Sequence, residues 1–315
     1  MKRQQGGNGK SQIMPSEMRK ALSRSGYLLE QRCEDIMRER IFLVETNTAY
    51  PDEFTGKSRE LDIRASCFGK AGPNEIDFVT GMILCECQNN IQPVVFFTKE
   101  PIAAFLHYYQ IKVSGMPSKI LAKDATGESF IALSEFLDMK KYHHYCKGRI
   151  ATQYCTFQLR KDKPEWIALH QEEQHDSIMV LIAAVEAEIK QFDESWVPPR
   201  DEPEPIDIQI YYPLIVLQGP LYEAFPVEGQ LKLRKSNHIQ FRKEYHSASR
   251  HDTYQIDVIT EPFLADYLAL VESEIEKTAK LLRQRKDIVR NSIEKIVGMA
   301  KAAKGGEEIK PIRVM

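Results

Sequence analysis

The chain has 315 residues, of which 43% are hydrophobic and 28% are charged. This composition supplies enough apolar side chains for a folded core, so it excludes a disordered or fibrous chain. The formal net charge is only −2, so any nucleic-acid surface should be a local patch on a near-neutral protein.

The first part of the chain alternates helical and extended patterns. Residues 1–16 are polar and predict a flexible arm. Apolar residues at helical spacing predict helices at Ser16–Arg40, Pro101–Val113, Leu133–Tyr145 and Glu172–Trp196. Extended patterns predict strands at Ile41–Thr46, Lys57–Cys67, Phe78–Gln88 and Gln92–Thr98. We assign residues 17–195 to one α/β domain.

A change in composition marks the middle of the chain. Residues 196–205 contain four prolines among acidic residues, which predicts a stiff linker. Beyond it, strands are predicted at Ile206–Tyr212, Leu214–Gln218, Gln230–Leu233, His238–Phe241 and Tyr254–Ile259. A long helix from Pro262 to Lys304 completes an α+β region over 206–315. Its length suggests a contact with a second copy or with a protein partner.

The cysteines and the lengths of the apolar segments indicate where in the cell the protein is located. Six cysteines in a chain of this length do not make a disulfide scaffold. The polar start lacks the apolar segment of a signal peptide, and the longest apolar run, Ile178–Val185, is far shorter than the roughly 20 residues of a membrane span. The run His143-His-Tyr-Cys146, together with Cys155, lacks the spacing of a zinc finger. We therefore expect a cytoplasmic protein with reduced thiols and no membrane partner.

Two predicted strands carry acids within apolar sequence. Side-chain alternation places Asp62 on one strand face with Glu60 and Arg64, and Glu86 on one face with Gln88. A carboxylate on a buried strand is costly unless it is paired or binds a cation. Two carboxylates from neighbouring strands suit a hard divalent ion such as Mg²⁺, which can activate water for attack on a phosphate.

These residues resemble the PD-(D/E)xK, or restriction-endonuclease-like, superfamily of nucleases. That pattern is a helix with an internal Glu, a strand with an Asp, and a later strand with Glu-x-Lys. The corresponding segments here are Gly26-Tyr-Leu-Leu-Glu30, Arg59-Glu-Leu-Asp-Ile-Arg64 and Glu86-Cys-Gln88. The resemblance covers roughly residues 20–115, about a third of the chain.

The resemblance implies a restriction-endonuclease-like mixed sheet flanked by helices. It implies hydrolysis of phosphodiester bonds, in DNA above all, with Mg²⁺ or Mn²⁺ as the cofactor. Asp62 and Glu86 would be the metal ligands. Glu30 and Gln88 would complete the catalytic set by positioning water or substrate. The resemblance also suggests a setting in restriction or defence.

Gln88 departs from the family pattern, because it stands where the motif has lysine. A lysine stabilises developing negative charge, whereas a glutamine positions water by hydrogen bonds and adds no charge. Lys112, or with less support Lys57 or Lys99, could supply the charge from a neighbouring element. The alternative is a nuclease-like module that binds nucleic acid or a protein without cutting.

A second group of residues predicts nucleic-acid contacts. Basic side chains between 234 and 250 could neutralise phosphates, and the interleaved Phe241 and Tyr245 could stack on bases. A solvated hairpin is the alternative interpretation. The basic residues are Arg234, Lys235, Arg242, Lys243 and Arg250.

Overall fold

The computed structural model describes residues 13–23, 25–40, 42–52, 56–72, 77–124, 127–169, 172–195, 205–246 and 251–303. The helices are α1 (Pro15–Leu22), α2 (Tyr27–Glu39), α3 (Leu133–Phe136), α4 (Glu172–Ser195), α5 (Leu264–Gln284) and α6 (Lys286–Ala303). Short 3-10 turns are η1 (Ala104–Gln110), η2 (Met139–Lys141), η3 (His144–Cys146) and η4 (Glu261–Phe263).

The strands fall into one large sheet and one small hairpin. The large sheet contains β1 (Leu43–Asp52), β2 (Lys57–Lys70), β3 (Phe78–Gln88), β4 (Val94–Lys99), β5 (Lys112–Met116), β8 (Ile150–Leu159), β9 (Trp166–Leu169), β10 (Asp207–Leu217), β11 (Leu221–Val227), β12 (Gln230–Ser236), β13 (His238–His246) and β14 (His251–Thr260). The hairpin pairs β6 (Lys119–Asp124) with β7 (Gly127–Ala132).

The large sheet is mixed, in the order β1-β2-β3-β10-β14-β13-β8-β4-β11-β12. Strands β1, β2 and β3 form an antiparallel meander, and β10 then runs parallel to β3 from the pair Asp207↔Phe78 to the pair Leu217↔Gln88. The predicted regions 17–195 and 206–315 therefore contribute strands to the same sheet. The predicted linker at 196–205 lies outside the described residues, except for residue 205.

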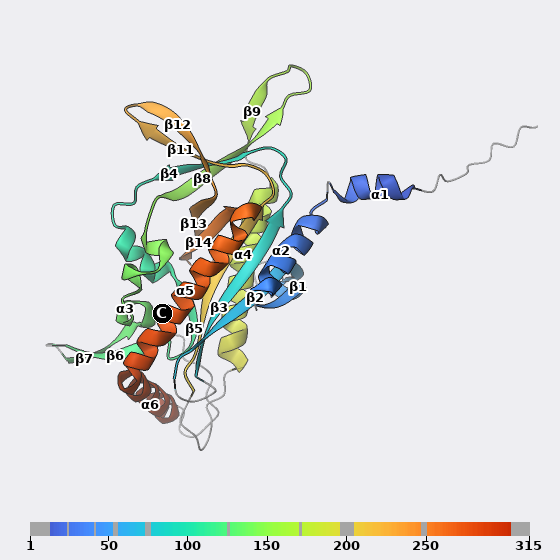
Figure 1. The fold of residues 1–315 in the computed structure, drawn as a ribbon. Helices are drawn as coiled ribbons and strands as arrows, with labels where there is room; N and C mark the ends of the chain where they lie inside the picture. Colours follow the sequence, from blue (N-terminus) through green and yellow to red (C-terminus); the bar gives the residue numbers. More distant parts are fainter. Residues whose placement is uncertain are drawn as a thin grey trace, which may run out of the picture.

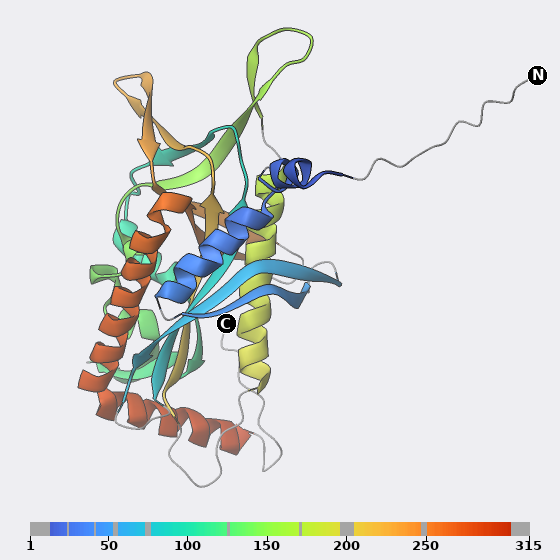
Figure 2. The same cartoon turned by 45° about the vertical axis from the view of Figure 1, so that its right-hand side comes forward.

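Helices cover both faces of this sheet, so the predicted α/β class with flanking helices is confirmed. Helix α4 lies on one face, and α2 and α5 lie on the other (Figures 1 and 2). Two hydrophobic cores result, one on each side. On α4, Ile178, Leu181 and Val185 are buried at helical spacing, and each fully buried side chain of this kind stabilises the fold by about 1.5–3 kcal/mol.

The predicted helix at Ser16–Arg40 is two helices. The break falls at Ser25-Gly26, because serine and glycine disfavour helix interiors. None of the residues of α1 is buried, and the helix stands apart from the body (Figure 2). The predicted flexible arm over 1–16 overlaps α1 at its last two residues, and residues 1–12 lie outside the described part.

The long C-terminal helix is present, but it divides at Arg285 into α5 and α6. Helix α6 leaves the axis of α5 and packs against β6 (Figure 1). The division follows this tertiary contact, since the sequence has no proline or glycine there. Within the described residues, none of the helices is long and apolar enough to cross a membrane.

The middle of the chain differs most from the prediction. The helix predicted at Pro101–Val113 is the turn η1 followed by β5, which pairs with β10. The helix predicted at Leu133–Tyr145 is α3 with two 3-10 turns. At the end of the first of these segments, pairing of β5 with the distant β10 overrides the local helical pattern. The hairpins β8–β9 and β11–β12 project from the body in both views (Figures 1 and 2).

Candidate functional site

The predicted acids lie on three neighbouring elements. Glu30 lies in the first turn of α2, Asp62 in β2 and Glu86 near the end of β3. The antiparallel pairing of β2 with β3 begins at Ile63↔Cys85 and continues away from the acids. The two strands therefore do not pair as regular partners at the level of Asp62 and Glu86. The side chains of these two acids lie at this opening between β2 and β3.

The predicted face alternation fails in part at Asp62. Leu61 belongs to the core beneath α4, whereas Ile63 and Ala65 belong to the core beneath α5. Strict alternation would place all three on one face. Opposite Asp62, Asn47 of β1 has a φ of 51°, in the left-handed region. This local irregularity turns β2 and aims the Asp62 side chain along the sheet towards β3.

Hydrogen bonds hold the two strand carboxylates. The backbone N–H of Cys87 donates to Oδ2 of Asp62 at 2.7 Å. In return, the backbone N–H of Asp62 donates to the carboxylate of Glu86. The hydroxyl of Ser177, from α4, also donates to Glu86. Each acid is thus fixed by donors on neighbouring elements, which is the preorganisation that a metal or catalytic site requires.

The three acids also act on one another electrostatically. Burial and then the charge of Asp62 raise the pKa of Glu86 to about 8. Burial and Asp62 likewise raise the pKa of Glu30. Burial raises the pKa of Asp62, although the Cys87 N–H opposes the shift. Unfavourable burial and like-charge repulsion are both relieved by a bound cation, so this donor set fits a divalent metal ion.

The spacing of the acids limits how many can share an ion. Among the described residues, Glu30, Asp62 and Glu86 do not form a group whose three ligand atoms all lie within 4.8 Å of one another. Asp62 and Glu86 are the pair linked most directly, because the carboxylate of each accepts a hydrogen bond from the backbone of the other strand. Mg²⁺ uses one or two carboxylates, with water and phosphate oxygens filling the rest.

Gln88 is the fourth predicted residue, and it is buried, with 9% of the residue's surface exposed. Both amide atoms, Oε1 and Nε2, are buried and lack a hydrogen-bond partner within the structure. A buried amide without partners costs free energy, so such a group calls for a water, an ion or a substrate atom. Its place, two residues beyond Glu86 on β3, is where the resemblance puts the water-positioning residue.

The three lysines predicted to replace the motif lysine lie on different strands. Lys112 on β5 forms an ion pair with Asp252 at 2.5 Å and lies over the ring of Tyr254. Its charge is therefore engaged by residues of β14. Lys57 begins β2 and Lys99 ends β4, and both are exposed. Burial dominates the pKa of Asp62, and burial together with Asp62 dominates the pKa of Glu86; a cation is not among the causes of either shift.

The predicted nucleic-acid residues lie on two strands. Arg234 and Lys235 are exposed on β12 in the projecting β11–β12 hairpin, and Arg234 is paired with Glu223. Arg242 and Lys243 are half-buried on β13. Arg250 lies outside the described residues. The structure thus divides the predicted basic patch between a hairpin arm and the body of the sheet.

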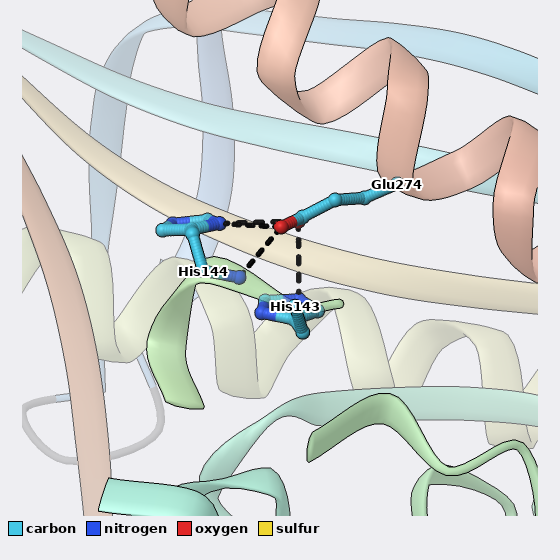
Figure 3. A group of neighbouring side chains, drawn as sticks. All are labelled: His143, His144 and Glu274. Carbon is cyan, nitrogen blue, oxygen red and sulfur yellow. Dashed lines mark hydrogen bonds and ion pairs between the residues drawn. The ribbon is translucent and has the colours of Figure 1, made fainter. Parts of the chain in front are cut away.

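A buried polar network that the sequence did not predict lies between η3, β14 and α5. Figure 3 shows Glu274 of α5 between His143 and His144. Nδ1 of His144 lies 3.1 Å from both Glu274 oxygens, and Nε2 lies 2.9 Å from Oδ2 of Asp257. Tyr267 also donates to Asp257, at 2.8 Å.

The charges of this network follow from its hydrogen bonds. Burial would lower the pKa of His144, but Asp257 and Glu274 outweigh it and raise that pKa to about 10. Burial lowers the pKa of His143 to about 4, so this ring is neutral. His144 is thus an imidazolium between two carboxylates, which needs no metal to balance it. We assign the network to stability rather than to catalysis.

Sequence reasoning missed this network because its members are distant along the chain. One signal was available. Glu274 falls in the buried stripe of α5, beside Val271 and Ile275. An acid inside an apolar helical stripe indicates a buried partner. Ser177, which binds Glu86, gave no such signal, since a serine on an amphipathic helix is ordinary.

Comparisons with protein-family models, with curated proteins and with solved structures find no match to this chain. The site is therefore interpreted from its own chemistry. That chemistry consists of three converging acids, an unpartnered buried amide and the opening between β2 and β3 that holds them.

Proposed function

We propose that the protein is a divalent-metal-dependent nuclease that hydrolyses phosphodiester bonds, with DNA as its substrate. The observation that carries the proposal is the mutual effect of the three half-buried acids. The charge of Asp62 acts on both Glu30 and Glu86, and the pKa of Glu86 reaches about 8. Acids that disfavour one another's ionised form, in a site without a dominant cation, are suited to hold Mg²⁺ or Mn²⁺.

Each residue has a distinct part in the proposed reaction. When bound, the ion supplies a Lewis acid that lowers the pKa of water and neutralises charge on the phosphate. Asp62 and Glu86 hold it, and their backbone and Ser177 donors keep the two carboxylates in place. Glu30 accepts a proton from the attacking water or orients it. Gln88 donates from its amide to a water or a phosphate oxygen.

The proposal also includes the contacts to the DNA substrate and the location of the protein in the cell. Basic residues on β12 and β13 are the proposed contacts to DNA phosphates. All six cysteines are free thiols, which agrees with the reducing cytoplasm that we propose as its location.

A cleavage assay tests the proposal. Supercoiled plasmid and single-stranded DNA are incubated with the protein in Mg²⁺, in Mn²⁺ and in EDTA. Wild type should nick or linearise DNA with either metal and not in EDTA. Cleavage that is equal in wild type and in Asp62→Asn under both metals would exclude the proposal, because such activity would come from a contaminant.

A second candidate function rests on Gln88. Because a cation is not among the causes that shift the pKa of Asp62 or Glu86, and Gln88 is neutral, the site has less means of stabilising the charge that develops during hydrolysis. The chain could then bind DNA, or a protein partner through α5 and α6, without cutting. Efficient cleavage by wild type would exclude this second function. Binding in Mg²⁺ without cleavage, together with activity gained by Gln88→Lys, would support it.

A further inference from the structure

Three side chains on β13 and β14 form a ligand set on strands other than those that carry the acids. They are Glu244, His246 and His251, and all three are exposed. One ligand atom from each lies within 4.8 Å of the other two. Among the described residues, these ligand atoms take part in neither a hydrogen bond nor an ion pair, so each retains its lone pairs for a ligand.

Strand pairing places these residues together. His246 and His251 are directly opposed partners in the antiparallel ladder of β13 and β14. Their rings stack with centroids 3.6 Å apart. Glu244 lies two residues before His246, so alternation puts it on the same face. The pairing register thus fixes two imidazoles and a carboxylate on one side of a two-stranded ribbon.

We propose that Glu244, His246 and His251 form a surface site for a borderline divalent transition-metal ion, represented by Zn²⁺. Two imidazoles and one carboxylate are ligands that such ions prefer, whereas Mg²⁺ prefers oxygen alone. The site is therefore separate from the acid site in both position and metal class. Water takes the remaining coordination position, which is open to solvent.

The distances can be closed by rotation of the side chains alone. Zinc bonds of about 2.0–2.2 Å place the ligand atoms of a tetrahedral ion roughly 3.3 Å apart. The present atoms lie within 4.8 Å, and exposed side chains change rotamer freely. The two rings must rotate out of their stacked arrangement so that one nitrogen of each faces the ion. A bound ion then links β13 to β14 at the end of their ladder.

Zinc titration of the full chain tests the site. Binding is measured by competition with a chromogenic chelator in excess Mg²⁺. The same titration is run on Asp62→Asn protein, so that the result is independent of the acid site. Wild type and Asp62→Asn should both bind one equivalent. His251→Asn and Glu244→Gln should each weaken binding by about tenfold or more, because each removes a ligand.

His175→Asn is the matched control, because His175 is also exposed but lies on α4. It should bind zinc as wild type does. A second readout is the Co²⁺-induced paramagnetic shift of histidine ring protons, expected for His246 and His251 only. The proposal is overturned if no stoichiometric zinc binds, if His251→Asn or Glu244→Gln binds like wild type, or if Co²⁺ shifts other histidines instead.

Discussion

The carboxylate of Asp62 accepts a hydrogen bond from the backbone N–H of Cys87, with 2.7 Å between Oδ2 of Asp62 and the amide nitrogen of Cys87. Cys87 is the residue between Glu86 and Gln88, so this bond ties one predicted metal ligand to the strand that carries the other. It forms where the β2–β3 ladder opens, and it holds Asp62 in a position that strand alternation alone would not give.

The first prediction concerns Asp62→Asn. The amide oxygen can still accept from Cys87, so the fold should persist, but the negative charge for the metal is lost. We expect metal-dependent cleavage to fall by about 100-fold or more. Glu60→Gln is the control, because Glu60 is exposed two residues away on β2. Equal loss in both variants would mean that the effect is not specific to the site.

The second prediction concerns Gln88→Lys, which introduces the lysine of the motif that this site resembles. A lysine beside the acids supplies the missing positive charge, so cleavage should rise by about tenfold or more over wild type. Single-turnover rates at saturating Mg²⁺ measure the change. Thermal unfolding of the same variant checks that the buried position accepts the longer side chain. A folded variant with no gain in rate contradicts the assigned place of Gln88.

The third prediction concerns the partner of His144. Glu274→Gln leaves the buried imidazolium with one carboxylate, and we expect a loss of about 3–5 kcal/mol in the free energy of unfolding. Urea denaturation measures it. Glu276→Gln, two residues along and exposed, should change stability by less than about 0.5 kcal/mol. A small loss at Glu274 would show that the network contributes little.

The fourth prediction is a pH dependence of stability. The pKa of His144 is about 10 in the folded chain and near its ordinary 6.5 when unfolded. Its contribution is therefore complete below pH 6.5 and is lost as the pH rises towards 10. From this group alone, the free energy of unfolding should fall by up to about 1.4 kcal/mol per pH unit in that window. His144→Gln should remove this fall in the free energy of unfolding at alkaline pH. An unchanged slope would show that another group causes the pH dependence.

The fifth prediction concerns DNA binding. Lys235→Gln and Lys243→Gln should each weaken binding and reduce the slope of log K against log salt by about 0.9. Fluorescence polarisation in Ca²⁺, without cleavage, measures both quantities. Lys277→Gln, exposed on α5, is the control and should leave the slope unchanged. Identical slopes in all variants would remove β12 and β13 from the DNA contacts.

The sequence was sufficient for features that depend on local pattern. The strands of Asp62 and Glu86 and the amphipathic helix α4 follow from period-2 and period-3.6 repeats, and the structure has them. The order of acids along the chain also predicts that Glu30, Asp62 and Glu86 act together. The charge of Asp62 raises the pKa of both Glu30 and Glu86, but their joint role stays a prediction.

Features set by long-range pairing could not be predicted. The first two residues of β5, Lys112 and Val113, are predicted as the end of a helix but are extended, because β10 pairs with them. The strands predicted on either side of Pro213 form one strand, β10, held by β3 along its whole length. The link between His144 and Glu274 joins residues 130 positions apart, and no local pattern encodes it.

The central claim is that the carboxyl groups of Asp62 and Glu86 hold one divalent ion between them. A crystal soaked in Mn²⁺ and measured at a wavelength with strong manganese anomalous scattering tests it most directly. We predict an anomalous peak within bonding distance of one oxygen of each residue. An empty opening between β2 and β3 at saturating Mn²⁺, or a manganese peak bound only by other residues, would contradict the claim.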